Sequence, residues 1–292
     1  MMQASANYTD PEYSSDLHEK YRLSIQLRLN GFSFAIIDPE RMLLMQLKEF
    51  RLAFRSKRSI NEKWLDLQNY FLQFLHQEHF IIKSFQKVVF TIDHKEYTLM
   101  PKALVKGDNK NDYLLFNQSI AYHFESFTNA IPSKDFELIG AIYKPLKHII
   151  QDYFDSFSLL HSSSVLQNEV LKLSKNKKTG FKVYVSVSNH DMHIIAIKDA
   201  ELIMSNSFAF SSKEDFVYFI LLSYDQLKIN PEEDALFFLG DISKSSPIYQ
   251  IAWQYVRNIH FIDHTNEISA GSAFDQMPLH QYYILIQSAL CE

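Results

Sequence analysis

The sequence has a single cysteine, little glycine and no long apolar run. The cysteine, Cys291, cannot form a disulfide within the chain, which indicates a reducing compartment. No stretch approaches the ~18 uncharged apolar residues of a membrane-spanning helix. Residues 1–20 are polar and acidic, without the apolar core of a signal peptide. We therefore expect a cytoplasmic protein with no membrane insertion.

Glycine is scarce, with 6 residues among 292, whereas the chain has 24 Phe and 16 Tyr. Loops that cradle phosphate depend on glycine, so this shortage disfavours nucleotide chemistry. No G-x-S-x-G elbow, Walker A loop or C-x-x-C pair is present. The many aromatic residues indicate large, well-filled cores.

The net charge of −5 predicts no broad affinity for nucleic acid. Two short basic runs, one from Arg51 to Arg58 and one from Lys172 to Lys178, are more typical of solvated loops than of phosphate-contacting patches. The length of the chain favours about two domains.

An internal repeat is the most informative feature. Leu23–Phe50 aligns without a gap with Val183–Phe210, 160 positions later. Alternating apolar residues and turn signals such as Asn30-Gly31 indicate three strands in each copy. Only two of the 28 aligned pairs are identical, so a chance likeness of two β-meanders is the alternative. The shared order of three strands, a capped helix and a further strand favours duplication.

The helix after each copy is expected to begin at a capping box, at Ser59–Glu62 and at Ser211–Glu214. A strand follows each helix, at Val88–Ile92 and at Ala235–Leu239. The other expected elements are strands Tyr97–Val105, Ile120–Thr128, Phe136–Tyr143, Ser156–His161 and Ile259–Ile262, and helices Pro145–Phe154, Pro247–Val256 and Pro278–Leu290.

These elements predict an α/β protein of two domains, each a three-strand meander followed by alternating helices and strands. The serine- and lysine-rich stretch 162–180 is expected to connect them. The predicted parts are a polar N-terminal tail (1–20, mobile through Ser15), a first domain (21–165, with an insertion near 95–143), a second domain (181–274) and a C-terminal helix packing back on the first domain (275–292).

This element order resembles the actin-like ATPase superfamily, which has a ribonuclease H-like fold. Its members include actin, sugar kinases, the heat-shock ATPase, and bacterial division and pilus-assembly proteins. The runs Leu23–Asp38 and Phe90–Val105 look closer still to an uncharacterised bacterial family of this fold. The resemblance covers most of residues 21–292 and implies a duplicated fold whose C-terminal helix crosses back to the first domain.

The nucleotide motifs of that superfamily are degenerate here. Active members open each domain with a strand ending in Asp-x-Gly, whose Asp organises the metal and the attacking water. The corresponding stretches are Gln26–Arg28 and Ser186–Ser188, and neither contains a carboxylate. The adenosine element normally reads Leu-Gly-Gly, whereas this chain has Leu239–Asp241, and an acidic side chain there repels phosphate unless it holds a metal.

Five residues are candidate ligands in the expected interdomain cleft, namely Arg28, Asn30, Gly31, Gly240 and Asp241. Arg28 could contact an anion, so binding without hydrolysis stays open. We predict no catalytic residue, no metal and no cofactor, with ATP and Mg²⁺ as the alternative. An open polar cleft would favour a ligand, and bulky side chains such as those of Phe32 and Met192 filling it would exclude one.

Other polar groupings are better explained as structure. His190–His193 falls on a hairpin, where the two histidines would point to opposite faces. His260–His264 has no helical H-E-x-x-H geometry, and His76–His79 suits a helix C-terminus. Ser162–Ser164 is interpreted as part of a connection, because the sequence identifies no base or oxyanion site for it.

Two functions remain open. The first is a non-catalytic actin-like scaffold or interaction module that binds another protein or a copy of itself, which the aromatic content supports. The second is a nucleotide- or anion-binding sensor, or an ATPase- or kinase-like enzyme, that uses the interdomain cleft. The missing motifs favour the first.

Overall fold

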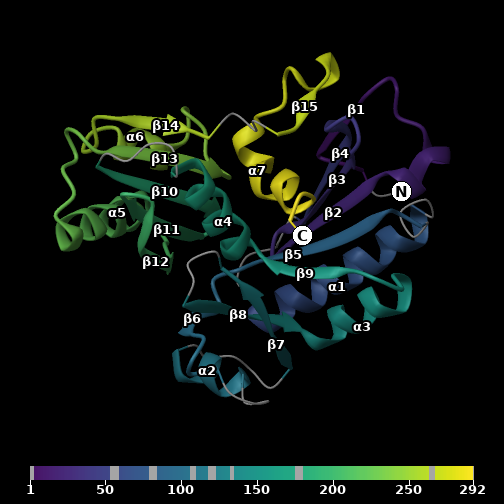
Figure 1. Ribbon diagram of the computed structural model, residues 1–292, viewed down its shortest axis with the longest axis horizontal. Helices are drawn as coiled ribbons and strands as arrows, with labels where there is room; N and C mark the ends of the chain where they lie inside the picture. The colour runs from purple at the N-terminus through teal and green to yellow at the C-terminus, as the bar shows by residue number, and fades with distance from the viewer. Residues whose placement is uncertain are drawn as a thin grey trace.

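The computed structural model describes residues 3–52, 59–78, 84–105, 110–117, 123–131, 135–174, 180–262 and 267–291. Three β-sheets organise these residues (Figure 1). The first sheet has seven strands, the second five and the third three. The first two sheets belong to the two halves of the repeat, and the third is built by the insertion in the first half.

The first sheet has the order β1-β4-β3-β2-β5-β9, with β15 paired to β4. Its strands β2, β3 and β4 form the antiparallel meander, while β5 and β9 extend it in parallel. The bounds are β1 Ala6–Thr9, β2 Arg22–Arg28, β3 Gly31–Asp38, β4 Leu43–Arg51, β5 Lys87–Asp93, β9 Ser158–His161 and β15 Ser269–Ala270.

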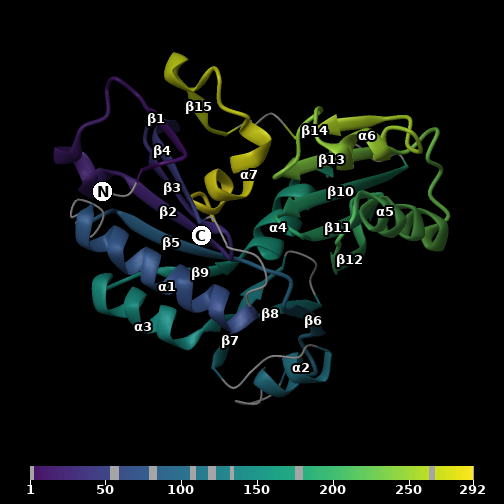
Figure 2. The same ribbon diagram turned by 180° about the vertical axis from the view of Figure 1, so that it is seen from behind.

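Helices α1 (Ile60–Gln77) and α3 (Lys144–Tyr153) lie side by side on one face of this sheet (Figures 1 and 2). Their buried residues, among them Trp64 and Phe71, join a core built on Phe32 and Phe90. Each such fully buried side chain contributes about 1.5–3 kcal/mol. This burial accounts for much of the aromatic content that the sequence shows.

The second sheet has the order β12-β11-β10-β13-β14. Its elements are β10 Phe181–Ser188, β11 Asp191–Lys198, β12 Glu201–Ala209, helix α5 Lys213–Leu227, β13 Ala235–Gly240, helix α6 Pro247–Ala252 and β14 Ile259–Phe261. The third sheet, β6-β8-β7, comprises β6 Tyr97–Pro101, β7 Phe124–Ala130 and β8 Phe136–Tyr143, with helix α2 Lys110–Asn117 against it.

The two halves repeat at the level of backbone register. Strands β3 and β11 begin and end 160 positions apart, as the alignment requires. Each carries a register shift against its outer neighbour at the same place, between Ile36 and Ile37 and between Ala196 and Ile197. In both sheets the first meander strand then pairs in parallel with the strand that follows the helix. A shared irregularity at aligned positions is strong support for duplication.

Two helices lie between the two large sheets. Helix α4 (Ser162–Ser174) and helix α7 (Leu279–Ser288) share a core with residues of the second sheet such as Tyr184 and Leu239. The other side of α7, with Leu285 and Ile286, packs on the first sheet. Figure 1 shows α7 between the two sheets. The C-terminal helix therefore returns to the first sheet.

Several expectations need correction. The N-terminal tail was expected to be mobile, but β1 pairs with β4 and buries Asp10. The stretch 162–180 was expected to be a connection, but its first part is the buried helix α4. The chain also returns to the first sheet before residue 275, because β15 pairs with β4 and Phe274 lies in the core beside it.

Smaller differences concern the insertion and one helix cap. Helix α2 was not expected, and β6 ends at Pro101 instead of Val105. The strand placed at Ile120–Thr128 is β7, which begins at Phe124, and residues 118–122 lie outside the described part. The Ser59 capping box is confirmed, whereas α5 is capped one residue later than expected, by Ser212.

Candidate functional site

The five candidate residues meet where the two halves of the chain face each other. Arg28 ends β2, Asn30 lies in the turn that follows, and Gly31 begins β3. Gly240 ends β13, and Asp241 follows it. The Asn30 amide lies 3.5 Å from Asp241 Oδ2, which connects the first half of the chain to the second.

Arg28 is buried at this boundary and is already paired. Its Nη2 donates to Glu49 Oε1 and to Ser33 Oγ, each at 2.8 Å. Its Nη1 lies 3.9 Å from Asp241 Oδ1. The side chains of Arg28 and Glu49 are 6% and 5% exposed, respectively. The guanidinium thus has a carboxylate partner from its own sheet and another from the second half.

Arg51 completes the network from the end of β4. Its Nε donates to Glu49 Oε2 at 3.0 Å, and its Nη2 donates to Asp241 Oδ1 at 3.2 Å. Two arginines and two carboxylates therefore alternate across the boundary. We call Arg28, Glu49, Arg51 and Asp241 the ion-pair network.

The environment of Arg28 keeps it charged. Burial alone would lower the pKa of its guanidinium, but Asp241 and Glu49 together more than offset that effect and raise it. The same balance raises the pKa of Arg51. Both guanidinium groups are consequently cations at any physiological pH, and their charge is neutralised within the chain.

Gly31 and Gly240 are each packed against the backbone of a neighbouring strand, which leaves no space for a side chain. Gly31 has φ 138°, and a Cβ atom there would lie 2.1 Å from the carbonyl oxygen of Phe50. Gly240 has φ 82°, and its Cβ would lie 2.1 Å from the carbonyl oxygen of Val187. Only glycine fits both positions. Their presence therefore needs no phosphate to account for it.

The two bulky residues that could have filled the expected interdomain cleft, Phe32 and Met192, lie in the hydrophobic cores of the two halves. Phe32 is fully buried in the first core, against Phe50, Phe71 and Phe74. Met192 is fully buried in the second core. Neither fills the boundary at Arg28. That place is taken by the ion-pair network.

A second buried polar network, which the sequence did not suggest, also joins the two halves. Asp93 at the end of β5 accepts hydrogen bonds from Gln26 Nε2 at 3.0 Å and from Ser162 Oγ at 2.7 Å. His193 on β11 places Nε2 at 3.9 Å from Asp93 Oδ1, and its Nδ1 lies 2.8 Å from Ser207 Oγ. The first turn of α4 is thus a buried polar contact, whereas the sequence was interpreted there as a connection.

Two buried histidines, His193 and His161, have lowered pKa values at this second network. Burial lowers the pKa of His193 to about 4. Burial, together with the nearby His94 and His193, lowers the pKa of His161 well below its usual value. Tyr97 packs against both rings, with centroid distances of 4.9 Å to His161 and 5.5 Å to His193. Burial among aromatic rings thus favours the neutral form of both imidazoles.

One sequence signal could have revealed the buried networks. Ser24, Gln26 and Arg28 alternate along β2 and are all buried, as are the apolar residues between them. Such a strand has one apolar face and one polar face, and the polar face lies against the second half of the chain. The period-two pattern predicts the strand. It does not show that the polar face is buried, because the polar face of a strand more often lies against solvent.

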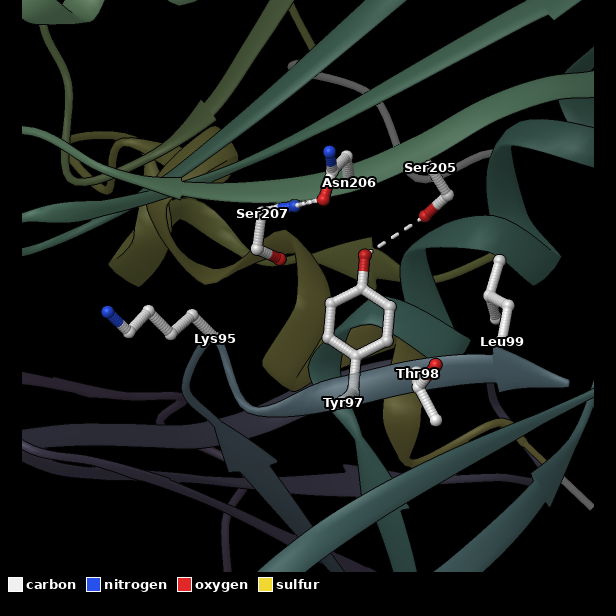
Figure 3. A pocket seen from close by; sticks show the side chains of 7 residues that line it. All are labelled: Lys95, Tyr97, Thr98, Leu99, Ser205, Asn206 and Ser207. Carbon is white, nitrogen blue, oxygen red and sulfur yellow. Dashed lines mark hydrogen bonds between the residues drawn. The ribbon is translucent and has the colours of Figure 1, made fainter. Parts of the chain in front are cut away.

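A pocket of about 420 Å³ opens beside this network, between β6 and β12 (Figure 3). The Tyr97 hydroxyl reaches across it to Ser205 Oγ at 3.1 Å. Its lining is mostly hydroxyl and amide groups, with a lysine at one end, and consists of Lys95, Tyr97, Thr98, Leu99, Ser205, Asn206 and Ser207.

The remaining polar groupings form no metal site in the part of the chain that is described. Within it, no cluster of three or more His, Cys, Asp or Glu could hold a metal ion. His76 Nε2 is hydrogen-bonded to the Tyr153 hydroxyl at 2.6 Å, and the His260 ring packs in a tilted contact against Phe237. His79 and residues 263–266 lie outside the described residues.

The basic runs are only partly described. Lys172 pairs with Glu169, and Arg51 belongs to the ion-pair network. Arg55, Lys57, Arg58, Lys175, Lys177 and Lys178 lie outside the described residues. None of the described helices is long and apolar enough to cross a membrane.

Residues 10–259 match the model of a protein family described as "Protein of unknown function (DUF3822)". The chain belongs to this family. No curated protein matches it significantly. The family description assigns no activity, so evidence on function has to come from the site and from solved structures.

Solved structures that resemble this chain show that it has an actin-like ATPase fold. A Bacteroides thetaiotaomicron protein with this fold and unknown function matches with a TM-score of 0.77 and 20% identity, over 96% of this chain and 99% of that one. A chain of the PilM–PilN type IV pilus biogenesis complex matches with a TM-score of 0.55 and 10% identity, over 92% and 97%. At these identities the likeness shows the fold alone, and it confirms the predicted fold class.

Proposed function

We propose that this protein of the DUF3822 family is a non-catalytic actin-like scaffold that binds another protein. The observation that carries the proposal is the ion-pair network at the end of β2. The resemblance to active members implies that a catalytic Asp and phosphate would meet there and at the end of β10. This chain has Arg28 and Ser188 at those strand ends, with Glu49 and Asp241 bound to its own arginines.

The electrostatics support this reading. A phosphate that approached Arg28 would also meet Glu49 and Asp241, which repel it. Releasing Arg28 for a ligand would leave Glu49 buried without its nearest cation, and breaking a buried pair in this way costs about 3–5 kcal/mol. The binding energy of a nucleotide would first have to offset that cost.

A protein partner is supported by two further observations. The structural neighbour PilM occurs in a complex with PilN. This chain also exposes large aromatic side chains, including Trp253 at 57% and Tyr255 at 50%. Tryptophan and tyrosine are the residues that most often carry binding energy at protein interfaces. The single cysteine supports a reducing, cytoplasmic setting for such a complex.

A titration with ATP, ADP and GTP in the presence of Mg²⁺ tests the proposal. Ligand that binds only the native state raises the melting temperature by mass action, so even weak binding is visible at millimolar concentration. We expect no shift. A shift that disappears in Arg51→Ala would defeat the scaffold proposal; this variant is preferable to Gly240→Val, which would clash with the Val187 carbonyl whatever the ligand.

One observation favours the second candidate, an anion-binding sensor. Arg28 Nε is buried and lacks a hydrogen-bond partner among the described residues, and the Arg51 side chain is half exposed beside it. An anion bound at Arg51 would have to compete with Asp241. A parallel titration with inorganic phosphate separates this candidate from nucleotide binding, because a simple anion site responds to both ligands.

A further inference from the structure

The turn that joins the first sheet to the third contains a buried histidine. His94 directly follows β5, and β6 begins three residues later at Tyr97. The His94 side chain is 1% exposed, and its ring lies edge-on to that of Trp64 on α1, with 5.4 Å between the centroids. An imidazole enclosed in this way needs a protein partner for each ring nitrogen, because water cannot supply one.

One ring nitrogen connects this turn to the third sheet. His94 Nε2 lies 2.8 Å from the carbonyl oxygen of Ala141 on β8, and because a carbonyl can only accept, this nitrogen carries a proton. The ladder between β6 and β8 runs as far as the pair Tyr97 and Gly140. The imidazole therefore bonds β8 one residue beyond that ladder, and it ties the third sheet to the end of β5.

The other ring nitrogen, Nδ1, has two neighbours that favour opposite protonation states. The backbone N–H of Glu96 lies 3.0 Å from it and would donate to a neutral ring. The Glu96 carboxylate also lies 3.0 Å away, and it can only accept, so it favours the imidazolium. If Nδ1 had no proton, the carboxylate would face a lone pair at hydrogen-bond distance. The observed position of the Glu96 side chain is therefore the one that suits a charged His94.

The charges around the turn also favour the imidazolium. Among the described residues, the titratable groups around His94 are Asp93, Lys95, Glu96 and Tyr97 from its own segment, His161 at the end of β9, and Asp191 and His193 on β11. Three of these groups are carboxylates and one is a lysine, while burial favours the neutral form of the two other histidines. The surroundings of His94 are thus negative on balance.

The pKa values of the two partners shift in the directions that an ion pair requires. Burial alone would lower the pKa of His94, but Glu96, helped by the Ala141 carbonyl and Asp93, more than offsets burial and raises it above 6.5. Burial alone would raise the pKa of Glu96, but the hydrogen bond and charge of His94 lower it. Both shifts favour the charged pair.

The same turn positions the contact between the third sheet and the second half of the chain. Tyr97 directly follows Glu96, and its hydroxyl reaches Ser205 Oγ on β12 at 3.1 Å (Figure 3). Its N–H donates to the carbonyl of Lys95 within the turn. A change in the turn would therefore act on β6 and on the Tyr97 contact together.

We infer that His94 is a proton-dependent switch in this turn: the imidazolium holds Glu96 and β8 together, and loss of its proton releases Glu96 and loosens β6 with Tyr97. The folded chain keeps a proton that the unfolded chain releases at about 6.5. The stabilisation is therefore complete below about pH 6.5 and is lost as the pH rises through the pKa of the folded state. No nucleotide or partner takes part, so this inference is independent of the scaffold proposal.

NMR titration of the histidine rings of the full chain, from about pH 5.5 to about pH 9, tests the ion pair. The absence of one signal in His94→Gln identifies His94. We expect wild-type His94 to titrate above 6.5, and Glu96→Gln to lower its pKa by about one unit or more. Glu125→Gln, which removes an ion pair with Lys147 elsewhere on the third sheet, should leave that pKa unchanged.

Amide hydrogen exchange of β6, corrected for the intrinsic pH dependence of exchange, tests the switch itself. Protection in the wild type should fall as His94 loses its proton, by about tenfold for each unit by which its folded pKa exceeds 6.5. His94→Gln keeps a donor for the Ala141 carbonyl but has no titrating group, so its β6 protection should not change with pH.

Three results would overturn the inference. They are a wild-type His94 that titrates at or below 6.5, a pKa of His94 that Glu96→Gln leaves unchanged, and β6 protection that stays constant while His94 titrates. If His94→Gln does not fold, as judged by circular dichroism, Glu96→Gln provides the same comparison in both assays, because the Glu96 side chain is 20% exposed and its replacement leaves the buried ring in place.

Discussion

Arg28→Met would measure how strongly the ion-pair network holds the protein together. The substitution keeps much of the side-chain volume and removes the charge that lies 2.8 Å from Glu49 Oε1. Glu49 would remain buried, with Arg51 at 3.0 Å as its remaining cation. Removing one partner of a buried ion pair costs about 3–5 kcal/mol, because the other charge stays desolvated. Since the Arg51 side chain is half exposed and still compensates in part, we expect a loss of about 3 kcal/mol.

The assay is urea denaturation at neutral pH, which gives the free energy of unfolding for each variant. The double variant Arg28→Met, Glu49→Leu should recover most of the loss, because no buried charge is then left unpaired. Asp225→Asn is the matched control, since its ion pair with Lys228 is exposed and should contribute less than about 1 kcal/mol. A loss below about 1 kcal/mol in Arg28→Met would refute the reasoning and would mark Arg28 as available to a ligand.

Three further predictions concern pH, glycine and a helix cap. Because burial lowers the pKa of His193 from 6.5 to about 4, the unfolded state binds more protons between these values. Stability should therefore fall by about 3 kcal/mol as the pH drops through this window, and His193→Gln should flatten the fall in acid titrations followed by circular dichroism. Asp191 acts in the opposite sense below about pH 6, so the comparison is best made in an Asp191→Asn background. Gly240→Ala should lose more than about 2 kcal/mol by urea denaturation, and Gly180→Ala, whose nearest contact is a side-chain oxygen at 3.1 Å, should lose less. Ser59→Ala should cost about 1 kcal/mol by removing the capping box of α1, and an unchanged midpoint would contradict this.

The sequence was sufficient to predict the fold because its signals are local. Alternation of apolar residues identified the meander strands, and the repeat at 160 positions matches β3 and β11 residue for residue. Hairpin turns and capping boxes are likewise set by a few neighbouring residues. The helix α2 was missed because it has only eight residues, Lys110–Asn117, and these show no clear amphipathic pattern. Its local sequence carries too little signal to separate a helix from a loop.

The site was only half predictable, for a physical reason. Arg28, Asn30 and Asp241 could be placed near one another by analogy with the fold, and the structure brings them together. Their partner Glu49 could not, because pairing across the sheet depends on which face each strand buries. The same holds for His193 and Asp93, which lie 100 residues apart and meet only through the packing of the two halves.

The way the halves are joined bears on what kind of actin-like protein this is. In a nucleotide-driven machine a ligand between the domains sets their relative position, and its loss or hydrolysis changes it. Here side chains of the chain itself make the corresponding connections, through Arg51 and Asp241 at one place and through Asp93 and His193 at another. Opening the halves would break the ion pairs and hydrogen bonds that both networks make across the boundary. A change in domain position would therefore need a ligand or partner whose binding offsets that cost.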